Sequence, residues 1–260
     1  MKLKGSIIAA AIAVCGCADD AGSIDQAAAA ATTGQGGGDR TLQKTLADPA
    51  PIGQTALNVE TIAEGLSNPW CIAFLPNGDM LVTERAGRIR IIRDGELLAD
   101  PVAGAPEPLV WNQSGYFDIL PHPDFETNQT VFFAYAHGTK DDNALRVISA
   151  KFDGAALSDI NVLYDAKPGK DTGHHYGGKL VIGGDDKLYF TIGEGSRYKE
   201  KAQDMASSFG AVVRINQDGS IPDDNPDFGD GSLPELYSKG HRNPQGFIYD
   251  AATDTYWEHE

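Results

Sequence analysis

The amino-acid sequence predicts an all-β protein of the propeller class. Four segments share one pattern, in which an apolar strand is followed by a turn rich in Gly, Asp or Asn and then by a second apolar strand. The segments begin at Trp70, Tyr116, Tyr176 and Gln245, so they recur at intervals of roughly 45 to 70 residues. A repeat near the lower end of this range, expanded by insertions, is typical of propeller blades. The chain is therefore predicted to hold about three blades and the start of a fourth.

The third segment is the best-defined hairpin. Strands are predicted over 179–182 and 188–192, with a Gly-Gly-Asp-Asp turn between them. His175 precedes the first strand and Glu194 follows the second, so the hairpin should return Glu194 to the level of His175. A carboxylate beside an imidazole orients the ring and stabilises its protonated form, which is typical of a general base. A simpler interpretation, two solvated histidines at 174 and 175, is disfavoured by the hairpin.

A rigid polar loop, Gly-His-Arg-Asn-Pro-Gln-Gly, spans residues 240–246. Pro244 restrains Asn243 to extended geometry, and the flanking glycines allow tight turns. Loops of this kind commonly carry binding and catalytic groups. Taken alone, the loop also allows a second interpretation, in which Arg242 only pairs with a surface carboxylate.

Four motifs together resemble the glucose/sorbosone dehydrogenase family of soluble quinoproteins. They are the two segments above and the stretches 66–92 and 112–125, and they occur in family order. The resemblance runs from Leu57 to the last residue. It implies a six-bladed β-propeller, incomplete in this chain. It also implies an oxidoreductase that uses pyrroloquinoline quinone (PQQ) and calcium to oxidise the anomeric hydroxyl of an aldose to a lactone by hydride transfer.

The resemblance assigns roles to five residues. His175 is the catalytic base. Glu194 supports it where the family usually has Asp, a difference of one methylene that can shift the contact by about an ångström. Gln113 lies near the sugar and the cofactor. Arg242 stabilises charge on the quinone and, with Asn243, contacts the cofactor.

The family's calcium ligands and the basic residues that hold the cofactor carboxylates are expected just beyond Glu260. The resemblance therefore implies that residues 52–260 are the N-terminal part of a propeller and are inactive by themselves. A different class of function, a non-catalytic propeller that binds sugars, glycans or a protein partner, is the alternative, because a fold does not determine a function. A lactonase-type calcium propeller is not supported, since its metal-binding carboxylates are not evident.

The N-terminus predicts export. Residues 1–17 combine an early positive charge, an apolar run over 7–14 and a lipobox that ends at Cys17, which is typical of a bacterial lipoprotein signal. Lipidation of Cys17 would anchor the protein in the periplasm, at the outer membrane in preference to the inner one. Cleavage without lipidation is the alternative. Residues 18–51 are rich in Ala, Gly and Thr and are predicted to be a flexible tether.

The charge of the chain bears on which partners it can bind. Asp and Glu number 37 against 21 Lys and Arg, a formal charge of −16, which argues against nucleic acid as a partner. A small sugar is the expected partner, and the electron acceptor is unknown.

Cys71, the cysteine that remains beyond the lipobox, is predicted to be a core residue. The acidic stretch 223–227 is interpreted as a solvated loop in preference to a calcium site.

Overall fold

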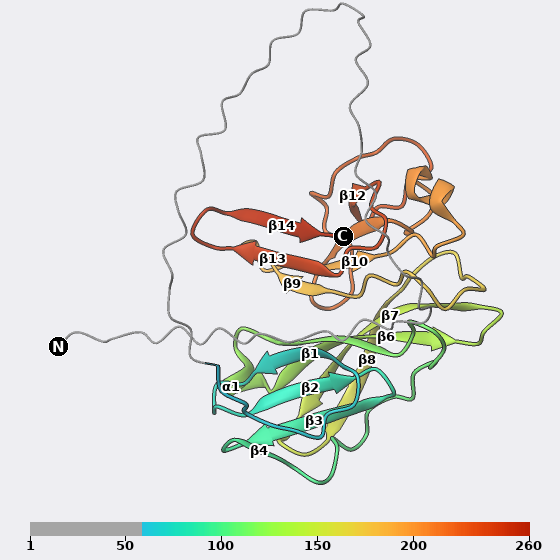
Figure 1. Cartoon of the computed structure of the whole chain (residues 1–260). Helices are drawn as coiled ribbons and strands as arrows, with labels where there is room; N and C mark the ends of the chain where they lie inside the picture. The colour runs from blue at the N-terminus through green and yellow to red at the C-terminus, as the bar shows by residue number, and fades with distance from the viewer. Residues whose placement is uncertain (1–58) are drawn as a thin grey trace, which may run out of the picture. The chain divides into compact units, whose positions relative to one another are not determined.

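A computed structural model of the chain describes residues 59–260; the predicted signal, Cys17 and the tether lie outside the described residues. From Ile62 onward the chain forms one compact unit. It contains three four-stranded antiparallel sheets and a two-stranded hairpin (Figure 1). In residues 59–260, no helix is long and apolar enough to cross a membrane. The prediction of an all-β fold with about three blades and the start of a fourth is confirmed.

The first blade is a meander in which each strand pairs with the next. Its strands are β1 (Pro69–Phe74), β2 (Met80–Glu84), β3 (Arg88–Arg93) and β4 (Glu96–Leu97). A tight turn joins β1 to β2, and Gly78 occupies its left-handed position with φ of 91°. Asp79, at the end of this turn, accepts hydrogen bonds from the Arg93 guanidinium at 2.7 and 2.9 Å. A salt bridge therefore links the start of β2 to the end of β3, in addition to the strand pairing.

The second blade has the longest strands, and its second strand is buried on both faces. Its elements are β5 (Tyr116–Pro121), α1 (Phe125–Asn128), β6 (Thr130–Gly138), β7 (Asn143–Phe152) and β8 (Leu157–Asp165). Along β6, Val131 and Phe133 pack into the core shared with the first blade, whereas Phe132 and Ala134 pack into the core shared with the third. The alternation of side chains along a strand therefore supplies two cores at once.

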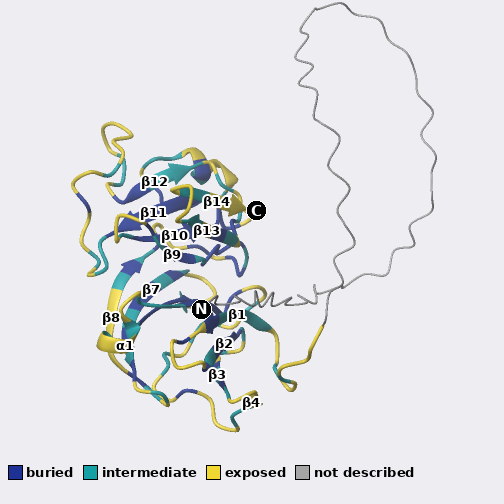
Figure 2. Ribbon diagram, turned by 90° about the vertical axis from the view of Figure 1, so that its left-hand side faces the viewer, coloured by how far each residue is buried: buried dark blue, intermediate teal, exposed yellow. Residues whose placement is uncertain are grey.

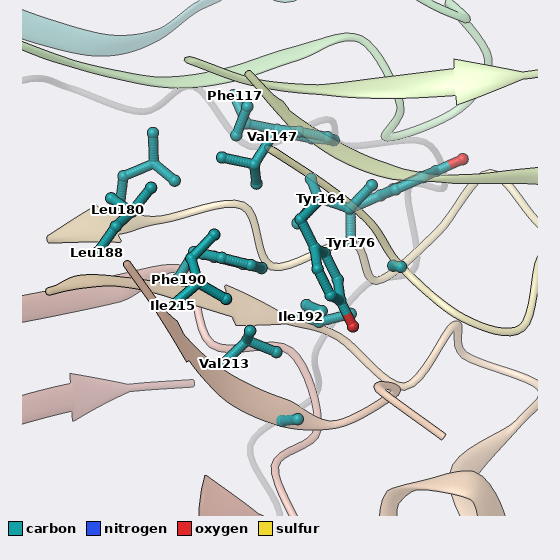
Figure 3. Close-up of a cluster of buried hydrophobic side chains, with 14 of the residues drawn as sticks. Phe117, Val147, Tyr164, Tyr176, Leu180, Leu188, Phe190, Ile192, Val213 and Ile215 are labelled. Carbon is teal, nitrogen blue, oxygen red and sulfur yellow. The ribbon is translucent and has the colours of Figure 1, made fainter. Parts of the chain in front are cut away.

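The third blade repeats this arrangement. Its elements are β9 (Leu180–Ile182), β10 (Leu188–Ile192), η1 (Lys199–Gln203), β11 (Ala211–Ile215) and β12 (Leu236–Lys239). Every residue of β10 is buried (Figure 2). Phe190 and Ile192 lie in the core shared with the second blade, beside Val147 and Tyr164 (Figure 3). Tyr189 points to the opposite core.

The first strand of this blade begins one residue later than predicted. The sequence predicts a strand over 179–182, and β9 starts at Leu180. Gly177 and Gly178 adopt φ of 66° and 95°, which breaks the regular extended geometry of a strand. A Cβ atom at Gly178 would lie 2.7 Å from the Phe117 ring, so the glycines let this segment pass close to its neighbours.

The fourth blade is represented by one hairpin, β13 (Gly246–Asp250) and β14 (Thr255–His259). Phe247 is buried against the third blade, in a cluster that includes Tyr189 and Tyr256. Ile248 and Trp257 are 57% and 62% exposed. The hairpin therefore buries one face and leaves the other open in the described structure.

The first strand of each blade contacts the first strand of the next: β1 meets β5, β5 meets β9, and β9 meets β13. This is the arrangement of inner strands in a propeller. The segments that lead into β5, β9 and β13 consequently lie close together. Residues 111–115, 172–179 and 240–245 form these segments.

Candidate active site

His175 and Glu194 form a buried pair at the end of the third blade. His175 lies in the segment before β9, and Glu194 follows β10 after a single glycine. Antiparallel pairing of β9 with β10 brings the two together, and His175 Nδ1 lies 2.7 Å from Glu194 Oε1. The side chains are only 10% and 5% exposed. Because an ionised carboxylate can only accept, Nδ1 carries the proton and Nε2 keeps its lone pair. The pair can therefore act as an oriented base.

The backbone of His175 adopts a left-handed conformation, with φ of 52°. This region is uncommon for residues other than glycine and is often found at functional sites. The His175 N–H donates to Gln113 Oε1 at 3.0 Å, and the Gln113 N–H donates to the Gly173 carbonyl at 2.9 Å. The segments that lead into β5 and β9 are thus fastened to each other beside the imidazole.

The predicted polar loop, residues 240–246, is fastened to the same place. Asn243 Oδ1 accepts the N–H of Gly177 at 3.0 Å, and the Arg242 carbonyl accepts the N–H of Glu194 at 2.8 Å. Thr191 Oγ1 donates to the Pro244 carbonyl at 2.8 Å. The structure therefore brings all five predicted site residues together from three consecutive blades. Their catalytic and cofactor-binding roles stay predictions.

The groups around His175 suit a ligand that is rich in carbonyl and carboxylate oxygens. Gln113 and Asn243 each use their side-chain oxygen on a backbone N–H, which leaves their amide NH₂ groups as donors. The Arg242 side chain is exposed, and within residues 59–260 its guanidinium has no hydrogen-bond or ion-pair partner. These donors fit an anionic quinone such as PQQ. They do not by themselves supply the several cations that would hold three carboxylates.

Among residues 59–260, no group of three or more Asp and Glu side chains alone is gathered closely enough to hold a metal ion. The group that best resembles a metal site consists of His241, Glu258 and Glu260, whose ligand atoms lie within 4.8 Å of one another. One of its three ligands is an imidazole, whereas calcium prefers oxygen atoms. Burial raises the pKa of Glu258, and the neighbouring charge of Glu260 raises it further. His241 Nδ1 lies 3.3 Å from Glu258 and 3.2 Å from Glu260, as in an ion-paired cluster.

Arg214 holds the acidic stretch 223–227 through an ion pair and a hydrogen bond. Asp224 accepts from the Arg214 guanidinium at 2.7 Å, and Asn225 Oδ1 accepts from the same guanidinium at 2.7 Å. Arg214 also donates to Asp185 in the β9–β10 turn at 2.8 Å. The Arg214 charge holds the pKa of Asp224 below its usual value. The stretch therefore forms a structural clamp between two loops of the third blade.

Two buried charged residues near the site were not identified from the sequence. Lys170 is 4% exposed, and its amine donates to the backbone carbonyls of the two histidines, His174 and His175. Asp118, in β5, accepts from the N–H of Leu180 at 2.8 Å and from Cys71 Sγ at 2.5 Å, with the Lys179 ammonium 3.0 Å away. Burial raises the pKa of the Cys71 thiol, which agrees with a core role. A lysine in a polar loop carries no signal of burial, and a single aspartate in an apolar strand does not show which groups it contacts, so only the fold reveals these contacts.

Gly193 lies in close contact with two residues of the site, and we expect Gly193→Ala to destabilise the protein there. An added Cβ would lie 2.3 Å from the His175 carbonyl oxygen and 2.8 Å from Asn243 Oδ1. Overpacking of this kind lowers the free energy of unfolding by about 1–3 kcal/mol. Urea denaturation would measure the loss. Gly78→Ala is the control: its Cβ meets nothing within 4 Å, so it should lose about 1 kcal/mol to its left-handed φ without disturbing the site.

Comparison with known proteins finds a family and several relatives that match most of this chain. Residues 66–260 match the family described as glucose/sorbosone dehydrogenase. The uncharacterized protein slr1608 of Synechocystis sp. is 40% identical over 225 residues, which are 80% of this chain and 55% of that protein. Aldose sugar dehydrogenase YliI of Escherichia coli is 33% identical over 209 residues, 78% of this chain and 56% of that protein. The PQQ-bound aldose sugar dehydrogenase of Streptomyces coelicolor has a similar structure, with a TM-score of 0.66 and 28% identity over 77% of this chain and 58% of that one.

The chain spans about half the length of the curated relatives it matches. The family match covers every described blade and includes the predicted site residues from Gln113 to Asn243.

Proposed function

The chain belongs to the glucose/sorbosone dehydrogenase family, and on this premise we propose that the full-length protein is a PQQ-dependent sugar dehydrogenase. It oxidises the anomeric hydroxyl of an aldose to a lactone. The observation that carries this proposal is the buried pair of His175 and Glu194, with Nδ1 and Oε1 at 2.7 Å. Gln113 and Asn243, from the neighbouring blades, accept hydrogen bonds from the backbone beside that pair, and the Arg242 carbonyl accepts the N–H of Glu194.

In the proposed mechanism His175 Nε2 removes the proton of the sugar hydroxyl. Glu194 keeps the proton on Nδ1 and stabilises the imidazolium that forms. Gln113 and Asn243 hold the backbone around the base through their side-chain oxygens, and their NH₂ groups would be available as donors to the ligand. The exposed Arg242 guanidinium provides positive charge for developing negative charge on an oxygen. Bound PQQ would supply the two-electron redox chemistry by accepting the hydride.

Calcium is proposed as a second cofactor from the family resemblance. None of the described residues is assigned to it, because the His241 cluster mixes imidazole with carboxylates. We therefore derive no catalytic step from calcium at these residues.

The test of this function is turnover by the full-length gene product. The protein is incubated with PQQ and calcium, and reduction of an artificial dye is followed with a panel of aldoses. Sugar-dependent reduction that requires PQQ, together with lactone formation, supports the proposal. Sugar binding without dye reduction or lactone would contradict it and favour a non-catalytic binding propeller.

We also propose that the protein is anchored in the bacterial periplasm through a lipid on Cys17, with the outer membrane favoured. Cys17→Ser should therefore abolish incorporation of labelled fatty acid and move the protein from the membrane fraction to the soluble fraction. Immunoblotting of the two fractions measures this. A Cys17→Ser protein that stays in the membrane fraction would argue against the anchor. Cys71→Ser is the matched control, because Cys71 is a buried core thiol.

A further inference from the structure

Lys170 contacts the backbone of the candidate base, His175, and is almost fully buried, with 4% exposure. It belongs to the loop between β8 and β9. Its backbone is anchored to the second blade, because Lys170 and Asn143 each donate an N–H to the carbonyl of the other at 2.9 Å. The side chain passes Gly195, where an added Cβ would lie 3.1 Å from Lys170 Cδ. The lysine is therefore held at its backbone and along its stem.

The terminal amine of Lys170 contacts three consecutive residues. It donates to the carbonyl oxygen of His174 and, at 3.2 Å, to that of His175. It also lies 3.4 Å from the centre of the Tyr176 ring, within the range of a cation–π interaction. Burial lowers the pKa of Lys170 to about 7, while the charge of Glu194 opposes this. Both the ammonium and the neutral amine have enough N–H groups to reach both carbonyls.

These contacts act on the peptide group that sets the direction of His175. The carbonyl of His174 and the N–H of His175 belong to one planar peptide group. Lys170 donates to its oxygen, and Gln113 Oε1 accepts from its N–H at 3.0 Å. The plane is thus held at both edges, and its orientation determines the left-handed φ of 52° at His175. Such a conformation persists only when the surrounding structure enforces it.

We propose that Lys170 is a positioning residue that, together with Gln113, holds the 174–175 peptide so that His175 reaches Glu194 and presents Nε2 to the sugar. The kinetic part of this inference rests on the proposed function. The geometric part concerns only the His175–Glu194 hydrogen bond and stands independently of turnover.

The test compares two buried lysines in the full-length protein. Lys239 is the matched control: its amine donates only to backbone carbonyls, those of Lys201, Ser207 and Phe209, and burial lowers its pKa to about 8. The variants are Lys170→Met and Lys239→Met. Methionine keeps an unbranched apolar stem and removes the donor, so both variants should lose thermal stability.

The first readout is the His175 Nδ1–H proton resonance in protein labelled with ¹⁵N-histidine, assigned by its loss in His175→Ala. In Lys170→Met we expect its exchange with water to be at least tenfold faster, or the signal to disappear. Lys239→Met should retain the parent signal. The second readout is sugar oxidation, in which Lys170→Met should lower kcat by about ten- to a hundredfold with KM within about threefold.

A folded Lys170→Met protein with the parent Nδ1–H signal would overturn the inference. If that variant does not fold, Lys170→Gln replaces it, because its shorter amide cannot reach both carbonyls, and the same two outcomes apply. If the parent oxidises no sugar, the proposed function fails, but the proton signal still decides whether Lys170 positions His175.

Discussion

Replacing His175 by alanine is expected to lower kcat by about a hundred- to ten-thousandfold in the full-length protein. Proton removal by a positioned base contributes about that much to a rate. His175 is buried beside Glu194, and the described residues around it hold no second imidazole in contact with that carboxylate. PQQ binding should persist, because the Gln113, Arg242 and Asn243 side chains remain. Steady-state dye reduction gives the rate, and fluorescence or absorbance titration gives the PQQ affinity.

His174→Ala is the control for this experiment. His174 is the neighbouring residue, and burial lowers the pKa of its imidazole, with the nearby charges of His175 and Lys170 adding to the effect. Its side chain makes no contact with Glu194, so its loss should be much milder. If His175→Ala retained activity within a few fold of the parent, the assignment of the base would be wrong. Comparable losses in both variants would point to a general disturbance of the loop.

The repeat pattern predicted the fold because each blade begins with a hairpin that the sequence marks by two apolar strands and a turn rich in Gly, Asp or Asn. The strand at 188–192 matches β10 residue for residue, and its side chains alternate between two cores because the period along a strand is two. The strand predicted over 179–182 corresponds to β9, which begins one residue later, at Leu180. Gly177 and Gly178 take positive φ just before it, so the regular strand geometry does not extend back toward Tyr176.

The meeting of His175 with Glu194 was predictable, since a short hairpin returns the chain to the level where it began. Convergence with Gln113, Arg242 and Asn243 was implied by family resemblance alone, because it depends on the order of inner strands in space. The contacts of Lys170 and Asp118 were beyond prediction. Lys170 lies in a polar loop and Asp118 in the apolar strand β5, and the partners of both come from other segments of the fold.

Glu194→Gln is expected to lower kcat by about a hundredfold. The carboxamide keeps the length of the side chain, and its oxygen can still accept a hydrogen bond from the Nδ1–H of His175. It carries no charge, however, and the imidazolium that forms when His175 takes the sugar's proton loses its stabilising partner. Removal of one preorganised electrostatic group commonly has an effect of about this size. Burial strengthens the effect, since the Glu194 side chain is only 5% exposed and water cannot replace it.

Glu194→Asp separates charge from reach. Aspartate is the usual residue at this position in the family, but the backbone here is spaced for a longer side chain, with Oε1 at 2.7 Å from Nδ1. We expect this variant to retain activity within about tenfold of the parent, because small shifts of the loop can restore the contact. The measurement is kcat for both variants at matched PQQ occupancy, with melting temperatures to show that both are folded. A Glu194→Gln protein with the kcat of the parent would mean that His175 draws no support from this carboxylate, and a non-catalytic role for the propeller would then be favoured.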